Sequence, residues 1–100
     1  MSKSLVKVEC FNPNTGRRMN IDSETYELFT KAIKQTLKAG KEITFSEIVE
    51  GIKKYFRSQN IGFKKSVPWY AVTVKNDMQV RNVIEVFTEK GRKLHRMRRN

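Results

Sequence analysis

The first fifth of the chain alternates apolar and polar residues, as one face of a β-sheet requires. Two such runs lie within residues 4–21, and the turn-forming residues Asn12 to Gly16 separate them. Proline fixes φ, while Asn and Gly tolerate positive φ, so this stretch predicts a β-hairpin. An isolated two-stranded hairpin is marginal in water. We therefore expect it to pack on a later part of the chain.

Three later segments have apolar residues at helical spacing, and they cover residues 22–40, 45–57 and 66–81. Asp22 stands at the N-cap of the first segment. Thr44 and Glu47 have the spacing of a capping box at the start of the second. Ser66 can cap the third, with Pro68 in its first turn, where a missing N–H costs little. These signals predict three α-helices.

The period changes again after the third helix. Residues 83–97 read as two strands joined by a turn, and Asn82 tolerates the left-handed conformation needed to leave the helix. Residues 42–44 are extended and can form a short strand. The order hairpin, helix, short strand, helix, helix, hairpin predicts an α+β fold in one domain spanning residues 1–100. We interpret it as a winged helix-turn-helix with a C-terminal β-hairpin wing and an extra N-terminal hairpin.

Charge adds a functional indication. The chain has 21 Lys and Arg against 10 Asp and Glu, a net charge of +11, and residues 61–100 carry 10 of the basic and only 3 of the acidic residues. No acid follows Glu89. Such a field attracts polyanions, of which nucleic acid is the most abundant in a cell. A generally basic surface that serves solubility is the alternative explanation.

The basic residues near the wing are candidates for phosphate contacts: Lys65, Lys90, Arg92, Lys93, Arg96, Arg98 and Arg99. A helical wheel of residues 66–81 places one apolar face, with Tyr70 and Val74, toward the other helices. The opposite arc carries the candidates for base contacts: Val72, Lys75, Asn76 and Gln79. Lys can reach guanine, and Asn or Gln can pair with adenine, although solvated polar residues would look the same. Asp77 and Arg81 are spaced to form a surface ion pair.

Catalytic and metal-binding patterns are absent from the sequence. Cys10 and His95 are the only residues of their kinds, and both fall in predicted strands. They could meet only if the two hairpins pair, and two ligands do not make a structural zinc site. There is no phosphate-binding glycine motif and no carboxylate cluster. We therefore expect no enzymatic activity, no cofactor and no metal, with Cys10 as a small buried residue.

The chain also lacks an apolar run of the roughly 20 residues that a membrane span needs. Its first ten residues lack the apolar core of a signal peptide. With one cysteine and no internal disulfide, this indicates a soluble protein of a reducing compartment, without membrane contact.

The element order from Asp22 to Met97 resembles that of the winged-helix superfamily. The segment from Val74 to Val86 looks like the junction between helix 3 and wing in many bacterial regulators, where a glycine commonly stands at the position of Asn82. Three stretches, ECFNPNTG at 9–16, MNID at 19–22 and SVPWY with TVK at 66–75, are similar to a small uncharacterised bacterial family with a winged-helix-like domain. The resemblance implies a fold and a bacterial cytoplasmic protein, and it implies no activity.

We expect a small non-enzymatic protein that binds double-stranded DNA, as a nucleoid-associated transcriptional regulator would. Two alternatives stay open at this point. The hairpin at 4–21 has edges that can pair with a protein partner or a second copy, which would make the chain an assembly module. RNA binding would use the same positive charge.

Overall fold

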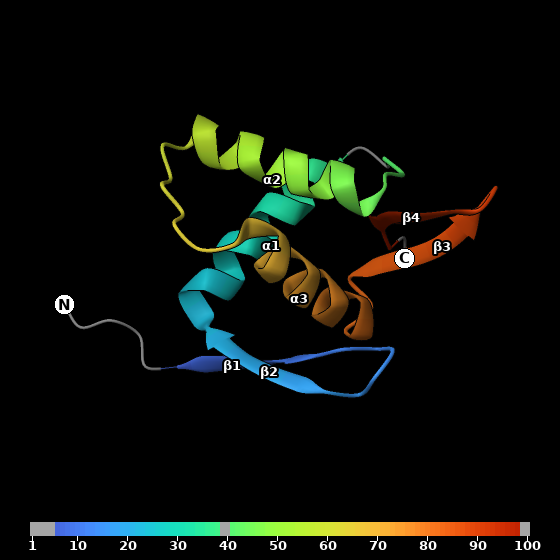
Figure 1. The fold of residues 1–100 in the computed structure, drawn as a ribbon, viewed down its shortest axis with the longest axis horizontal. Helices are drawn as coiled ribbons and strands as arrows, with labels where there is room; N and C mark the ends of the chain where they lie inside the picture. The colour runs from blue at the N-terminus through green and yellow to red at the C-terminus, as the bar shows by residue number, and fades with distance from the viewer. Residues whose placement is uncertain (1–5, 39–40, 99–100) are drawn as a thin grey trace.

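The computed structural model describes residues 6–38 and 41–98, and within these ranges it contains three helices and two antiparallel hairpins (Figure 1). The elements are β1 (Lys7–Phe11), β2 (Arg18–Asp22), α1 (Ser23–Leu37), α2 (Phe45–Ser58), α3 (Val67–Val80), β3 (Ile84–Glu89) and β4 (Arg92–Met97). The protein is therefore an α+β domain, as the pattern predicts. The expected helix end at residues 39–40 lies outside the described residues.

The helices begin where the capping residues stand. Thr44 and Glu47 form a complete capping box at the start of α2. The Ser66 hydroxyl accepts a hydrogen bond from the Trp69 N–H at 3.2 Å at the start of α3. Asp22 takes the N-cap position of α1, where its carboxylate makes an ion pair with a lysine of β1 instead of a capping hydrogen bond. Local sequence therefore determines these boundaries.

Helix α3 ends at a left-handed residue. Asn82 has φ of +63°, and the Val83 N–H donates to the Met78 carbonyl at 2.8 Å. The Asn82 N–H donates to the Gln79 carbonyl at 3.1 Å, which completes a Schellman motif. The left-handed conformation predicted for Asn82 is confirmed, and it directs the chain into β3.

The main core lies among the three helices around Phe29, which is fully buried. Its ring centroid lies 5.3 Å from that of Phe56, 5.0 Å from that of Phe63 and 5.7 Å from that of Tyr70. The pairs with Phe56 and Phe63 are edge-to-face, the arrangement that the ring quadrupole favours. Phe63 belongs to the connection between α2 and α3, so the cluster also anchors that loop.

The C-terminal hairpin β3–β4 has a two-residue turn at Lys90 and Gly91, whose φ values are +54° and +77°. Two left-handed residues suit a type I′ turn, the common connection of a tight hairpin. The extended segment at 42–44 meets this hairpin: Ile43 and His95 exchange backbone hydrogen bonds of 3.1 and 2.8 Å. A short bridge therefore ties the start of α2 to β4.

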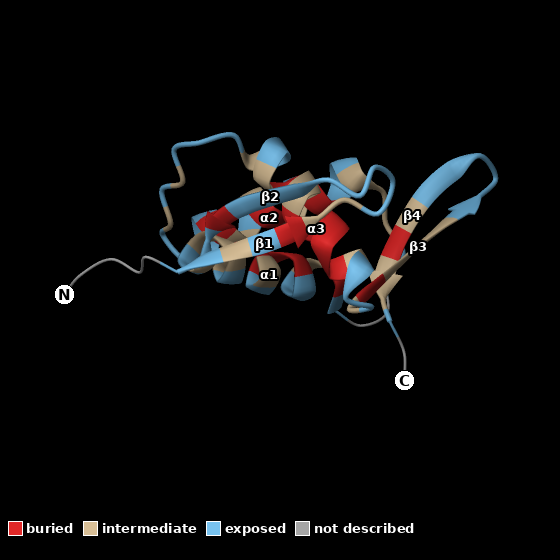
Figure 2. Cartoon of the chain, turned by 90° about the horizontal axis from the view of Figure 1, so that it is seen from below, coloured by how far each residue is buried: buried red, intermediate tan, exposed pale blue. Residues whose placement is uncertain are grey.

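The N-terminal hairpin lies against α3 and α1, on the side away from α2 (Figures 1 and 2). Its inward face buries Cys10 and Ile21. Its outward face carries exposed ion pairs, one between Lys7 and Asp22 and one between Glu9 and Arg18. The hairpin does pack on a later part of the chain, as expected, and α3 becomes a middle layer that is covered on two sides.

A buried carboxylate joins the hairpin to the helices. Asp77 on α3 is fully buried; its Oδ1 accepts from the Phe11 N–H at 3.0 Å, and its Oδ2 accepts from the Tyr26 hydroxyl at 2.6 Å. The Arg81 Nε donates to Oδ2 at 2.6 Å, and an Nη of Arg81 donates to the Glu9 carbonyl at 3.3 Å. The predicted Asp77–Arg81 ion pair exists. Its predicted place on the surface is wrong, because β1 covers the carboxylate.

The groups around Asp77 are held in the states that donate to it. Burial, and then the hydrogen bond to Asp77, raises the pKa of Tyr26 above its ordinary value, so the phenol keeps its proton. The hydrogen bond to Asp77 raises the pKa of Arg81 as well. Asp77 thus satisfies donors from β1, α1 and α3 together.

Removal of the Asp77 carboxylate should loosen the hairpin. We expect Asp77→Ala to lower the free energy of unfolding by about 3 kcal/mol, because two buried donors lose their acceptor at about 1–3 kcal/mol each. Urea denaturation measures the change. The control is Glu9→Gln, which breaks an exposed ion pair on the same hairpin and should cost less than about 1 kcal/mol. Equal losses for the two variants would contradict the assigned role of Asp77.

Candidate nucleic-acid interface

The tip of the β3–β4 hairpin carries three exposed cations, Lys90, Arg92 and Lys93. None of them makes an ion pair with a described residue. Arg92 lies near enough to Glu47 to contribute to the lowered pKa of that carboxyl, whose main causes are the capping hydrogen bonds from Thr44. Their charge is therefore available to an anionic partner. We call these three residues the wing-tip cations.

Two further predicted phosphate contacts, Arg96 and Arg98, are engaged within the protein. Arg96 donates to Glu85 and to Glu42, both at 2.9 Å, and stacks over the Phe87 ring at 4.7 Å from its centroid. Arg98 lies 3.9 Å from Glu85. Antiparallel pairing sets Glu85 opposite Arg96, so strand register supplies the acid that is absent from the sequence after position 89. Acidic side chains of the protein partly balance the charge of these two arginines. They are therefore less available to phosphates than the sequence indicated.

The two remaining predicted phosphate contacts lie elsewhere. Lys65 is exposed and precedes the N-cap of α3, whereas the wing follows the other end of that helix. A helix of this length separates the two ends by about 20 Å. Lys65 therefore lies apart from the wing-tip cations. Arg99 lies outside the part of the chain that the structure describes.

The predicted base-reading face of α3 is largely covered. Lys75 is 6% and Asn76 8% exposed, while Val72 and Gln79 are partly exposed. The expectation that Lys75 and Asn76 face outward is wrong. The helical wheel assigned α3 one buried face, toward the other helices. The N-terminal hairpin and the base of the wing pack against α3 as well, so its polar residues also become buried.

Lys75 and His95 are both buried, and both lie near enough to Lys93 to be affected by its charge. Burial, and then repulsion from Lys93, lowers the pKa of Lys75 to about 8. Burial is also the main cause that lowers the pKa of His95, with repulsion from Lys75 and Lys93 adding to it and a hydrogen bond to Ile43 opposing it. His95 is fully buried; its Nδ1 lies 3.1 Å from the Ile43 carbonyl, and its Nε2 has no hydrogen-bond partner among the described residues. The histidine is thus a neutral part of the helix–wing junction.

Cys10 and His95 are not brought into one sheet. They belong to two separate two-stranded sheets, so the pairing of hairpins that would have brought them together is not found. Burial raises the pKa of Cys10 to about 12, which keeps the thiol protonated and poorly nucleophilic. Within the described ranges, no three His, Cys, Asp or Glu side chains gather as metal ligands would.

A small cavity of about 250 Å³ opens between the N-terminal hairpin and α3. Its lining comprises Cys10, Phe11, Asn12, Arg17, Met19, Trp69, Val72, Thr73 and Asn76. Sequence reasoning missed this cavity, because it exists only where the hairpin meets the helix. The exposed Trp69 forms one of its walls.

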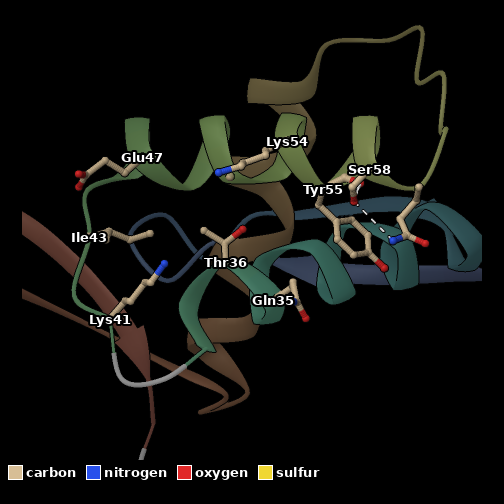
Figure 3. Close-up of a pocket in the computed structure, with 10 residues that line it drawn as sticks. Gln35, Thr36, Lys41, Ile43, Glu47, Lys54, Tyr55 and Ser58 are labelled. Atoms are coloured by element: carbon tan, nitrogen blue, oxygen red, sulfur yellow. Dashed lines mark hydrogen bonds between the residues drawn. The ribbon is translucent and has the colours of Figure 1, made fainter.

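A larger groove of about 740 Å³ lies between α1 and α2 (Figure 3). The helices approach closely at its floor, where a side chain on Gly51 would overlap Thr36. Lys41 and Lys54 line the groove, and its one acid, Glu47, is occupied by the capping box of α2. Most of its polar side chains are exposed to solvent, so the groove does not indicate a ligand-binding site.

The chain matches a known protein family. Residues 7–94 match a family described as a family of unknown function, DUF6958. Because the match spans most of the sequence, the protein belongs to this family. Neither the curated proteins nor the solved structures contain a match. Among the described residues, no helix is long and apolar enough to cross a membrane.

Burial of Lys75 should cost stability in a pH-dependent way. The folded protein releases this proton near pH 8 and the unfolded chain near 10.5, so the unfolded state binds more protons between these values and stability rises with pH there. We expect Lys75→Met to raise the free energy of unfolding at neutral pH by on the order of 2 kcal/mol. The gain should shrink as the pH approaches 10.5.

Urea denaturation of both proteins across this pH range measures the difference. The exposed Lys31→Met serves as a control and should change stability by less than about 0.5 kcal/mol at any pH. A difference between wild type and Lys75→Met that does not vary with pH would contradict the shifted pKa.

Proposed function

We propose that this protein is a small, non-enzymatic winged-helix-type domain that binds double-stranded DNA mainly through its phosphates. The observation that carries the proposal is the set of wing-tip cations, which project on a hairpin from the body of the domain and lack acidic partners among the described residues (Figure 1). Phosphate contacts supply most of the affinity in nonspecific DNA binding.

Two features of the fold support the winged-helix part of the proposal. Three helices precede a C-terminal hairpin, in the order that a winged helix has. The Ile43–His95 bridge adds a short strand, before α2, to the edge of that hairpin. Sequence resemblance at the junction of α3 and β3 points in the same direction.

Because α3 is largely covered, few of its side chains can contact base edges in duplex DNA. Lys75 and Asn76 cannot reach base edges in the groove of a duplex while the N-terminal hairpin and the wing pack against them. Of the predicted base contacts, only Val72 and Gln79 keep partial exposure. The proposal is therefore binding with little sequence preference, in the bacterial cytoplasm at the nucleoid, and a regulator that recognises one operator is less well supported.

Fluorescence anisotropy with a mixed-sequence duplex over a salt series tests the proposal. Three wing-tip contacts predict a slope of about −3 in a plot of log affinity against log salt, near −0.9 per phosphate. Replacement of Lys90, Arg92 and Lys93 by Gln should remove most of the affinity and flatten the slope, equally for unrelated duplex sequences. Single-stranded DNA and RNA of the same sequence should bind more weakly.

A matched control separates the wing from overall charge. The triple variant Lys31→Gln, Lys34→Gln, Lys54→Gln removes the same charge from exposed positions on α1 and α2. It should keep most of the affinity. Equal losses of duplex affinity in the two triple variants would show that net charge alone causes binding, which contradicts a role of the wing. A duplex affinity that does not depend on salt would refute the proposal.

A second candidate function is a protein-assembly module. The covered face of α3 favours it, because a covered helix cannot read DNA bases while the N-terminal hairpin that covers it has open strand edges. Each strand of the two-stranded β1–β2 sheet leaves one edge without a partner strand in the described residues. Such an edge can pair with a partner or a second copy. Sedimentation at high salt distinguishes the two: a dimer that persists without nucleic acid favours assembly, and a monomer favours DNA binding.

A further inference from the structure

The cavity between the N-terminal hairpin and α3 is lined by a largely buried residue, Asn76, whose amide makes no hydrogen bond with the described chain. Asn76 is only 8% exposed and lines the cavity, yet its side chain has no hydrogen-bond partner among the described residues. The described side-chain atoms that are fully buried without a partner are Thr30 Oγ1 and His95 Nε2, so the Asn76 amide is not sealed in the core. It faces the open space of the cavity and is available to a ligand.

The other walls of the cavity are aromatic, apolar and positively charged. Trp69 is 42% exposed, and its ring packs edge-to-face on Tyr70 with 4.8 Å between centroids. Arg17 is exposed and its guanidinium makes no ion pair with a described residue. Among the described residues that line the cavity, Arg17 is the one cation and there is no acid. It therefore offers a stacking surface, an amide and a site for an anion, side by side.

The size of the cavity limits the ligand. Its volume of about 250 Å³ lies below the roughly 300–1,000 Å³ of sites for drug-sized molecules. A flat heteroaromatic ring fits this space, while a sugar and phosphate attached to the ring would extend past the rim. Arg17 belongs to the hairpin turn side of the cavity and is exposed to meet such a phosphate.

We propose that this cavity binds the adenine base of a nucleotide, with Asn76 pairing to the base, Trp69 stacking on it and Arg17 contacting its phosphate. A carboxamide has an acceptor beside a donor, which matches the amino group and N7 of adenine. Guanine presents two acceptors at the same edge, so one of its atoms would face the amide oxygen unpaired. The site is independent of the wing and does not rest on duplex binding.

The intrinsic fluorescence of Trp69 reports binding directly, because it is the single tryptophan of the chain. Adenosine monophosphate is the probe, titrated with excitation at the red edge of the indole absorption. Saturable quenching is the expected result, with guanosine monophosphate binding at least about tenfold more weakly for want of one hydrogen bond to a buried group. Absence of saturable quenching by adenosine monophosphate would overturn the proposal.

Two variants assign the contacts. Asn76→Leu replaces the amide by an apolar group of similar size and breaks no hydrogen bond within the described chain, so we expect a folded protein whose affinity for adenosine monophosphate falls about tenfold or more. A folded Asn76→Leu protein with unchanged affinity would overturn the proposal. Arg17→Gln should weaken adenosine monophosphate and leave adenosine unaffected, which a merely structural role of Arg17 would not do.

The same base can come from a free nucleotide or from an unpaired end of a nucleic-acid strand. A duplex with a single unpaired 3′ adenosine, compared with the blunt duplex and with free adenosine monophosphate, distinguishes these sources. Tighter binding of the overhang, lost in Asn76→Leu, identifies a strand end; equal binding of the two duplexes, with free nucleotide bound, identifies a soluble nucleotide. If neither source depends on Asn76, the proposal fails, whatever the wing binds.

Discussion

The buried carboxylate of Asp77 is the interaction on which the arrangement of this domain depends. A two-stranded hairpin has too little apolar surface to stay folded alone, and β1–β2 buries few large side chains. Asp77 adds directional contacts to that limited burial, because it accepts from the backbone of β1, from Tyr26 of α1 and from Arg81 at the end of α3. An ionised group in the interior needs several donors to offset its desolvation, and here they come from three elements.

The hairpin held there changes what α3 can do. In a winged helix that reads DNA, the third helix presents one polar face to the major groove. Here Lys75 and Asn76 are buried, so the predicted DNA contacts that stay exposed and make no ion pair with a described residue lie mainly on the turn of β3–β4. The hairpin also creates a cavity that neither element would form alone, with Asn76 at its wall. One docking contact therefore covers the α3 residues that would face base edges in a duplex, and it forms the cavity that we propose binds a single base.

The sequence predicts features that depend on neighbouring residues. The capping box of Thr44, the Ser66 cap and the left-handed Asn82 rest on local backbone chemistry, and all three are present. The sequence does not reveal contacts that depend on where distant segments meet. Asp77 finds its partners 66 and 51 positions earlier in the chain, and its burial could not be read from a helical wheel. Strand register likewise decides that Arg96 faces Glu85. The prediction that Lys75 and Asn76 face outward failed for the same reason, because the N-terminal hairpin covers α3.

We propose that the N-terminal hairpin stays on α3 while the wing binds duplex DNA. Amide resonances followed during titration with a blunt duplex test it most directly. If the hairpin stays on α3, the amide resonances of residues 88–93 change position as duplex is added. The Phe11 amide, which is hydrogen-bonded to Asp77, keeps its chemical shift and its slow exchange with solvent. A Phe11 amide that shifts or becomes rapidly exchanging as duplex is added would show that the hairpin leaves α3, and would contradict the account.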